Sequence, residues 1–322
     1  MIEAFNLLTK EIKEHDNIII MAHKAMDLDA YGASLCLYEI VKSFEKNVMI
    51  YMNRKPENKS IEKSIDALKE AAFYVNHIYD EKEIPEENTM VVVLDTHKAS
   101  LLENYEAIRK YEIFIIDHHI SNVETIESKF TYINHAISST VEILVNYAKY
   151  LNRTLSPIIA TIMLAGLEVD TNSFDVKTTD KTYEAAAYLA KSGADNIIKK
   201  QLLKEDKENY CKRQDFVKNS DMITENIALC VMDNNIYKKY MLALISEDLL
   251  QFDKVEASFT IGYVDENSVG ISARSIGNID VENIMYKLGG GGHKTDAATE
   301  IKGTNIEDVK NKFLKVIKEE IQ

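Results

Sequence analysis

The first half of the chain alternates short apolar runs with segments of helical spacing. Four runs are apolar nearly throughout, as expected for strands that are buried on both faces of a sheet. These runs are residues 17–22, 47–52, 89–94 and 112–116, and helical patterns at residues 30–44 and 101–110 lie between them. The alternation predicts an α/β fold with a parallel, doubly wound sheet.

The pattern changes in the second half of the chain. Residues 139–215 are almost entirely helical in pattern, and residues 199–219 are highly charged. We therefore expect a first domain at 1–198, a helical connector at 199–225 and a smaller α/β domain at 226–322. In this last domain the pattern predicts strands at 228–232, 255–263 and 269–274, and helices at 281–288 and 306–321.

Composition and charge narrow the class of protein. A chain of 322 residues favours two domains. Its 38 basic and 52 acidic residues give a net charge of −14, which argues against binding of long nucleic acid through a broad basic surface. Three widely spaced cysteines are typical of reduced thiols in a cytoplasmic protein. No apolar run approaches the roughly 20 residues that a membrane-spanning helix needs, so we expect no membrane segment in this chain.

Residues that bind metals follow three of the predicted strands. Because the carboxyl ends of parallel strands meet near the switch point of an open sheet, these side chains should converge on one pocket. Buried carboxylates without partners are costly, and divalent cations offset that cost. The candidates are His23, Asp27 and Asp29 after the first strand, Asp95 after the third, Asp117, His118 and His119 at the end of the fourth, and Asp170 at the end of a later helix.

The types of ligand predict the kind of ion. Aspartate oxygens together with neutral histidine nitrogens suit Mn²⁺, Fe²⁺, Co²⁺ or Zn²⁺ better than Ca²⁺ or Mg²⁺ alone. Four aspartates and two histidines are more than one ion needs. Two ions about 3.5–4 Å apart, bridged by one carboxylate, are the natural arrangement for hydrolysis of a phosphoester.

Each candidate also has an ordinary structural interpretation. His23 could be a core histidine, and Asp27 and Asp29 could be helix N-caps. Asp95 could belong to a turn, and His97 could either support the metal ligands or lie in a solvated turn. The order of these residues at successive strand ends favours a metal site over coincidence.

A glycine run in the smaller domain is the second candidate for chemistry. Residues 289–292 are all glycine and His293 follows them, so the run takes four of the eleven glycines in the chain. Glycines let backbone N–H groups approach an anion closely, although a flexible hairpin is the alternative explanation. Arg274, at the end of a predicted strand in the same domain, offers a planar donor for phosphate. Together they suggest a substrate clamp.

These motifs resemble the DHH phosphoesterase superfamily. H-x-x-x-D-x-D at residues 23–29, Asp95, Asp117-His118-His119 and Asp170 occur in the family's order, and GGGGH is similar to the signature of the DHH-associated domain. The resemblance covers essentially the whole chain. The stretches LDTHKASL, IDHH, ISSTVEIL, LAGLEVDTNSF and KLGGGGHKTDAAT are most similar to the catalytic portion of GdpP-type cyclic di-AMP phosphodiesterases.

The resemblance implies a role for each residue. It implies two divalent ions, with Mn²⁺ preferred, and a DHH catalytic domain joined to a DHH-associated substrate-binding domain. It places His23 and Asp27 on the first ion, Asp29, His118 and Asp170 on the second, Asp95 between the ions, and His119 against the scissile phosphate. It assigns Arg274, His293 and the backbone of Gly290, Gly291 and Gly292 to the other phosphate or the nucleotide.

The resemblance also implies an activity in bacterial second-messenger signalling. The expected reaction opens cyclic di-AMP to linear pApA, with a hydroxide activated by the two ions. A nano-RNase that also removes phosphate from 3′-phosphoadenosine 5′-phosphate is one alternative, and a non-catalytic nucleotide sensor is another. The expected location is the cytoplasm, or a membrane anchor if the chain is the catalytic portion of a longer family member. The sequence leaves homodimer formation open.

Overall fold

The computed structural model describes residues 1–120 and 125–320. The chain divides into two compact units, Met1–Lys204 and Glu205–Gln322. The segment predicted as a connector, 199–225, is divided between them. Helix α8 (Asn196–Leu203) ends in the first unit, whereas α9 (Lys207–Lys218) begins the second.

The first unit is built on a six-stranded parallel sheet with the order β3-β2-β1-β4-β5-β6. The expected parallel, doubly wound sheet is confirmed. The strand order reverses between β1 and β4, which is the switch point where ligands bind in open sheets. The strands are β1 (Asn17–Met21), β2 (Asn47–Tyr51), β3 (His77–Ile78), β4 (Thr89–Leu94), β5 (Glu112–Asp117) and β6 (Phe130–Ile133).

Both faces of this sheet are buried, because the apolar runs supply side chains to both. Ile18 and Ile20 of β1 pack into the larger core with the main helices. Ile19 and Met21, which point to the opposite face, belong to a second core. Every residue of β4 is buried. Continuous apolar runs are therefore explained by two-sided burial.

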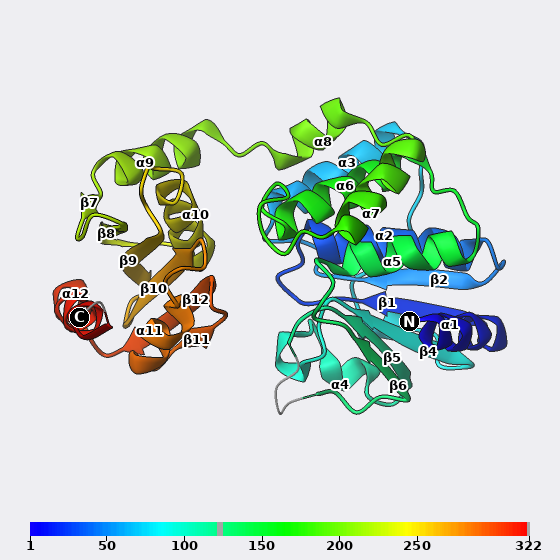
Figure 1. The fold of residues 1–322 in the computed structure, drawn as a ribbon. Helices are drawn as coiled ribbons and strands as arrows, with labels where there is room; N and C mark the ends of the chain where they lie inside the picture. Colours follow the sequence, from blue (N-terminus) through cyan, green and yellow to red (C-terminus); the bar gives the residue numbers. More distant parts are fainter. Residues whose placement is uncertain (121–124, 321–322) are drawn as a thin grey trace. The chain divides into compact units, whose positions relative to one another are not determined.

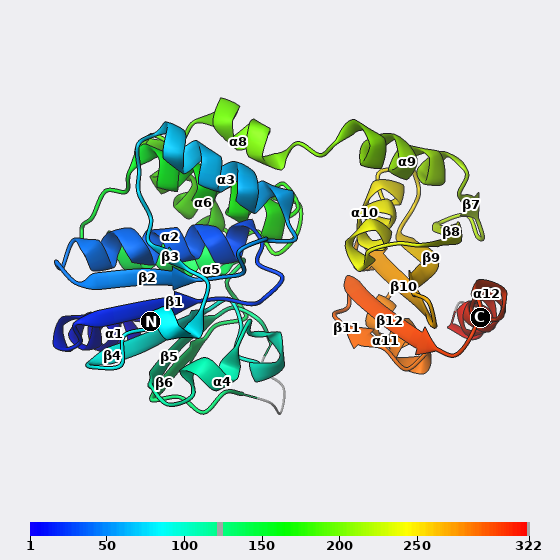
Figure 2. The ribbon, with the colours of Figure 1, turned by 180° about the vertical axis from the view of Figure 1, so that it is seen from behind.

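The two faces are covered unequally (Figures 1 and 2). The long helices pack into the larger core. The second core is covered by α4 (Tyr105–Ile108) and by two short 3-10 turns, Glu81–Glu83 and Ala99–Leu101. The predicted helix at 101–110 was therefore too long. The helices of the larger core are α1 (Ile2–Glu14), α2 (Leu28–Lys42), α3 (Lys59–Glu70), α5 (Thr140–Tyr150), α6 (Pro157–Asp170), α7 (Asp180–Lys191) and α8.

The second unit contains a mixed six-stranded sheet with the order β11-β12-β10-β9-β8-β7. Strands β8 and β9 are parallel, and the other described neighbours are antiparallel. This confirms the smaller α/β domain. Its elements after α9 are β7 (Asp221–Met222), β8 (Ile227–Ile236), α10 (Lys239–Leu249), β9 (Ala257–Asp265), β10 (Ser268–Ser275), α11 (Val281–Lys287), β11 (Gly291–Gly292), β12 (Asp296–Lys302) and α12 (Ile306–Glu320).

Helices cover both faces of this second sheet. Helices α11 and α12 share one core with β8, β9 and β10, and α10 packs with Val217 of α9 in another. Across both units, no helix among the described residues is long and apolar enough to span a membrane.

Candidate metal centre

Three of the predicted ligands form a group that we call the outer group: His23, Asp27 and Asp95. His23 follows β1, and its Nε2 lies 3.7 Å from Oδ2 of Asp27 and 3.4 Å from Oδ2 of Asp95. The other oxygen of Asp27 accepts the backbone N–H of Ala30 over 3.0 Å and so caps α2. Asp27 is therefore both an N-cap and a member of the group, one carboxylate oxygen for each.

Three further predicted ligands form the inner group: Asp29, His118 and Asp170. Nε2 of His118 lies 3.1 Å from Oδ2 of Asp170 and 4.0 Å from Oδ2 of Asp29. Asp29 is fully buried in the first turn of α2, and Asp170 is the last residue of α6. Residues distant in sequence therefore converge where the strand order reverses.

Asp95, a member of the outer group, also faces the inner group. Its Oδ2 faces His23, and its Oδ1 lies 3.4 Å from Nε2 of His118. The backbone of Asp95 has a φ of +61°, which few residues other than glycine adopt.

The two groups fit divalent cations. Within each group one ligand atom per residue lies within 4.8 Å of the others. Nε2 of His118 is buried and, although it lies 3.1 Å from Oδ2 of Asp170, it forms no hydrogen bond of favourable geometry with the described residues, which is unusual for a buried polar atom. A neutral imidazole nitrogen beside three carboxylates is a donor set that Mn²⁺ or Zn²⁺ accepts. The arrangement can therefore hold two cations that share Asp95.

The closely spaced carboxylates of this centre shift the pKa values of its histidines. Burial alone would lower the pKa of His118, but Asp170 and Asp95 raise it to about 11. Burial would likewise lower the pKa of His23, which Asp27 and Asp95 raise to about 10. Burial raises the pKa of Asp170 to about 6. Without cations, protons balance the buried carboxylates, and bound metal ions would replace those protons.

Asp117 orients the second histidine of the DHH motif rather than joining a metal group. Its Oδ1 accepts Nδ1 of His119 over 2.8 Å and also the backbone N–H groups of both histidines that follow it. Burial would raise the pKa of Asp117, but the bonds from His119 and His97 hold it below its usual value. An ionised Asp117 can only accept, so Nδ1 of His119 carries the proton and its Nε2 is left for a ligand. The His119 side chain is 52% exposed.

His97 supports this arrangement. Its Nδ1 hydrogen-bonds the second oxygen of Asp117, and the side chain is almost completely buried. Of the two interpretations left open by the sequence, the solvated turn is therefore wrong. Among the described residues, none hydrogen-bonds the buried Nε2 of His97.

Glu168, two residues before Asp170, forms an ion pair with Lys199 of α8. Both side chains are mostly buried. The charge of Glu168 is thus balanced within the first unit by a neighbouring helix, and Glu168 belongs to neither group.

The sequence analysis did not single out the first turn of α5. Both oxygens of Asp29 accept backbone N–H groups there, from Thr140 and Val141, each over 2.8 Å. The Thr140 hydroxyl donates to Oδ1 of Asp95 over 2.8 Å. The signal was present in the stretch ISSTVEIL, whose small polar residues precede an apolar run as an N-cap does.

In the second unit, Arg274 already has acidic partners. Its Nη1 lies 2.6 Å from Oδ1 of Asp296, and its Nε lies 3.2 Å from Oε1 of Glu247. Only 15% of the side chain is exposed. The predicted clamp residue is therefore held in place by two carboxylates.

The glycine run is partly required by the fold of the second unit. A Cβ at Gly290 would lie 2.2 Å from the carbonyl oxygen of Ala298, and Gly292 has a φ of +150°. A Cβ at Gly291 would meet no atom within 4 Å. His293 donates its backbone N–H to the carbonyl of Asp296 over 2.6 Å and closes the turn. The surrounding structure therefore explains why residues 290 and 292 are glycine, but it does not explain why residue 291 is glycine.

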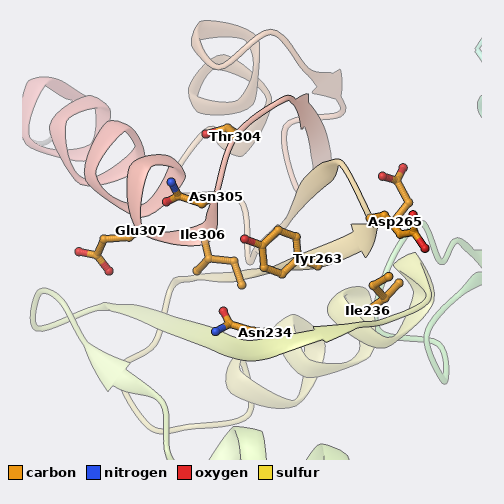
Figure 3. A pocket seen from close by; sticks show the side chains of 9 residues that line it. Asn234, Ile236, Tyr263, Asp265, Thr304, Asn305, Ile306 and Glu307 are labelled. Atoms are coloured by element: carbon orange, nitrogen blue, oxygen red, sulfur yellow. The ribbon is translucent and has the colours of Figure 1, made fainter.

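A separate cavity of about 640 Å³ lies in the second unit (Figure 3). Its lining includes Tyr263 together with three carboxylates, those of Asp265, Glu266 and Glu307. None of the predicted substrate residues lines it. The three acidic groups make it unsuited to an anionic ligand.

The chain matches two family descriptions. Residues 17–167 match "DHH family, N-terminal domain", and residues 225–322 match "DHHA1 domain". The chain belongs to the DHH family. The DHH match contains every predicted ligand except Asp170, which lies three residues beyond its end and joins the centre through α6.

Curated relatives of this DHH chain include cyclic dinucleotide enzymes. It is 33% identical over 97% of its length to "Cyclic-di-AMP phosphodiesterase GdpP" of Bacillus subtilis, and 30% identical over 96% to "Cyclic-di-AMP phosphodiesterase PdeA" of Listeria monocytogenes. It spans about half of these relatives, 49% and 48% of their lengths. It is also 24% identical over 88% of its length to "Bifunctional oligoribonuclease and PAP phosphatase NrnA" of Mycoplasma genitalium, covering 87% of that protein.

A solved structure has the same fold as this DHH protein. The crystal structure of an exopolyphosphatase-related protein from Bacteroides fragilis superposes with a TM-score of 0.78. The superposition covers 99% of this chain and 95% of the other, at 21% sequence identity. At that identity the likeness extends to the fold alone.

Proposed function

We propose that this protein is a metal-dependent phosphodiesterase that hydrolyses cyclic di-AMP to linear pApA. The convergence of the outer and inner groups on Asp95 carries the proposal. Similarity to cyclic-di-AMP phosphodiesterases over nearly the whole chain supports the choice of substrate.

The ligands of the two groups would hold two divalent ions, most suitably Mn²⁺. His23 and Asp27 would bind one ion, and Asp29, His118 and Asp170 the other, with Asp95 contributing one oxygen to each. Such a pair of ions supplies Lewis acidity and lowers the pKa of water for attack on a phosphodiester. The two groups would thereby set where the ions lie, and the ions would orient a phosphate between them.

His119 would contact the scissile phosphate. Asp117 accepts from its Nδ1, so Nε2 is the atom that would face the phosphate, and in the imidazolium form it would donate a hydrogen bond to a phosphoryl oxygen. A donor already oriented toward that oxygen stabilises the negative charge that develops there in the transition state. Removal of one such donor typically lowers turnover by roughly 100- to 1000-fold.

We propose that the DHHA1 domain grips the other phosphate or the nucleotide. Arg274 would supply charge-assisted hydrogen bonds, and His293 and the backbone of Gly290, Gly291 and Gly292 would supply further donors. The two carboxylates beside Arg274 keep its guanidinium in one orientation, which lowers the entropic cost of binding a substrate.

A second candidate is hydrolysis of short linear nucleotides or of 3′-phosphoadenosine 5′-phosphate. The similarity to the oligoribonuclease and PAP phosphatase of Mycoplasma genitalium favours it. A non-catalytic nucleotide sensor is a further alternative of another class. It would bind nucleotides without turnover, and a complete set of ligands argues against it.

Turnover with Mn²⁺ over a panel of nucleotides tests these alternatives. The panel contains cyclic di-AMP, pApA, short RNA and 3′-phosphoadenosine 5′-phosphate. The proposal expects cyclic di-AMP to have the highest kcat/KM and pApA to accumulate. Faster hydrolysis of pApA or of 3′-phosphoadenosine 5′-phosphate would favour the second candidate, and tight binding without turnover would favour the sensor.

A further inference from the structure

The first turn of α5 contacts two aspartates of the metal centre at once. The Thr140 hydroxyl donates to Oδ1 of Asp95 over 2.8 Å. The backbone N–H groups of Thr140 and Val141 donate to the two oxygens of Asp29. One helix terminus is therefore bonded both to Asp29 of the inner group and to Asp95 of the outer group.

The bond from Thr140 selects one oxygen of Asp95. Oδ1, which accepts the hydroxyl, faces His118, whereas Oδ2 faces His23. Rotation of the carboxylate about its Cβ–Cγ bond would exchange or misalign the two oxygens. The hydroxyl opposes that rotation, and Thr140 itself is fully buried and held by α5.

We propose that Thr140 is a positioning residue that orients Asp95, so that Oδ1 serves the ion of the inner group and Oδ2 serves the ion of the outer group. This inference rests on the two-ion centre of the proposed function. Thr140 acts through Asp95 and touches neither ion nor substrate. Partners of this kind orient metal ligands, and their loss typically lowers metal affinity by roughly 10- to 100-fold.

The variant Thr140→Val tests the contribution of the hydroxyl alone. Valine keeps the branched shape of threonine and the backbone N–H that Asp29 accepts, but it places a methyl group against Oδ1 of Asp95. Thr140→Ser keeps the donor and removes only the methyl group. The serine variant should therefore resemble the wild type, whereas the valine variant should lose the orientation of Asp95.

Ser139→Ala is a matched control. Ser139 is fully buried next to Thr140, and its Oγ accepts the backbone N–H of Glu142 over 3.1 Å as the N-cap of α5. Loss of this cap weakens the helix terminus without removing a bond to Asp95. The control variant should therefore lower the melting temperature and leave metal affinity unchanged.

Calorimetric titration with Mn²⁺ and electron paramagnetic resonance of the loaded protein test the proposal. Two Mn²⁺ ions bridged by one carboxylate give a spin-coupled spectrum, unlike the six lines of an isolated ion. Thr140→Val should bind its second Mn²⁺ about 10- to 100-fold more weakly and lose the coupled spectrum. Thr140→Ser should restore both, and Ser139→Ala should retain both.

Wild-type affinity and coupling in Thr140→Val would overturn the proposal, as would equal metal loss in Ser139→Ala. If the valine variant does not fold, Thr140→Ala removes the same hydroxyl without crowding Asp95, and the same two outcomes apply. Fewer than two bound Mn²⁺ ions in the wild-type protein would refute the two-ion centre itself. Failure of the two-ion centre can be told apart from failure of the Thr140 proposal, because it is measured on the wild-type protein alone.

Discussion

Nη1 of Arg274 lies 2.6 Å from Oδ1 of Asp296, four residues beyond the glycine run. Together with Glu247, Asp296 holds the guanidinium in a largely buried position. Burial raises the pKa of Glu247, and the charge of Arg274 opposes that rise. The arginine therefore stabilises the second unit as well as being the proposed phosphate ligand, and a test of its role must separate the two.

Arg274→Gln makes this separation, because glutamine still offers hydrogen-bond donors to Glu247. We expect the KM for cyclic di-AMP to rise about 10- to 150-fold, the cost of one lost charge-assisted phosphate contact. Hydrolysis of a small non-nucleotide phosphodiester should be unchanged. Arg213→Gln is the control, since Arg213 is also paired with two carboxylates, Glu205 and Asp248. Equal effects on both substrates would contradict the clamp.

The glycine run allows a second test of the same domain. Gly291→Ala should leave the melting temperature unchanged, because its Cβ would meet no atom within 4 Å. It should weaken binding of cyclic di-AMP, because the methyl group would stand where the anion must approach the backbone. Gly290→Ala should instead lower the melting temperature through its clash with Ala298. Wild-type substrate affinity in Gly291→Ala would show that no ligand approaches that backbone.

Asp95 should be the most sensitive metal ligand. Asn is the best replacement, because it tolerates the positive φ at this position and removes only the charge and one ligand oxygen. Asp95→Asn should lose at least one ion and lower kcat at least about 100-fold, with the fold retained. Metal analysis and circular dichroism check this, with Asp265→Asn in the second unit as control. Full metal occupancy and near-normal turnover would refute the bridging role.

His118 and His119 should differ in their effects although they are adjacent. His118 lies within the inner group, whereas Nδ1 of His119 hydrogen-bonds Asp117. His118→Ala should lower the metal content, and His119→Ala should retain the metal and lower turnover about 100-fold or more. Metal analysis of both purified variants decides this. Similar metal loss in the two would show that the roles are wrongly assigned.

Much of this centre could be predicted, because most of its candidate residues directly follow a strand or end a helix that can be recognised from its own local sequence. Ile18–Met21 is apolar throughout, so the strand and the polar residues after it could be located from sequence. Asp27 is instructive, because the helix cap and the metal ligand were alternatives in the sequence, whereas in the structure one carboxylate oxygen caps α2 and the other lies 3.7 Å from Nε2 of His23.

The interactions that sequence patterns missed join elements distant along the chain. The bonds from Thr140 to Asp95 and from His97 to Asp117 depend on how β4, β5 and α5 pack. The acidic partners of Arg274 come from α10 and β12, two elements that the apolar pattern did not predict. Short elements such as β3 also could not be predicted, because two residues are too few to show a periodic pattern.

His77, at the start of β3, should make stability depend on pH outside the metal centre. Its Nε2 lies 2.9 Å from the hydroxyl of Tyr31, a fully buried residue of α2. Burial, with a further contribution from Lys69, lowers the pKa of His77 from 6.5 to about 4. Burial raises the pKa of Tyr31, so its hydroxyl stays protonated and donates to the neutral imidazole.

The folded state binds a proton on the His77 imidazole more weakly than the unfolded state does. The free energy of unfolding should therefore fall as the pH drops from 6.5 towards 4. The loss attributable to His77 should be about 1–2 kcal/mol, after allowance for its partial exposure. His77→Gln can still accept from Tyr31 but does not titrate in this range. Urea unfolding of the metal-free wild type and variant at about pH 7 and about pH 5 should show the smaller change in the variant. An identical change in both proteins would mean that His77 keeps an ordinary pKa in the folded state.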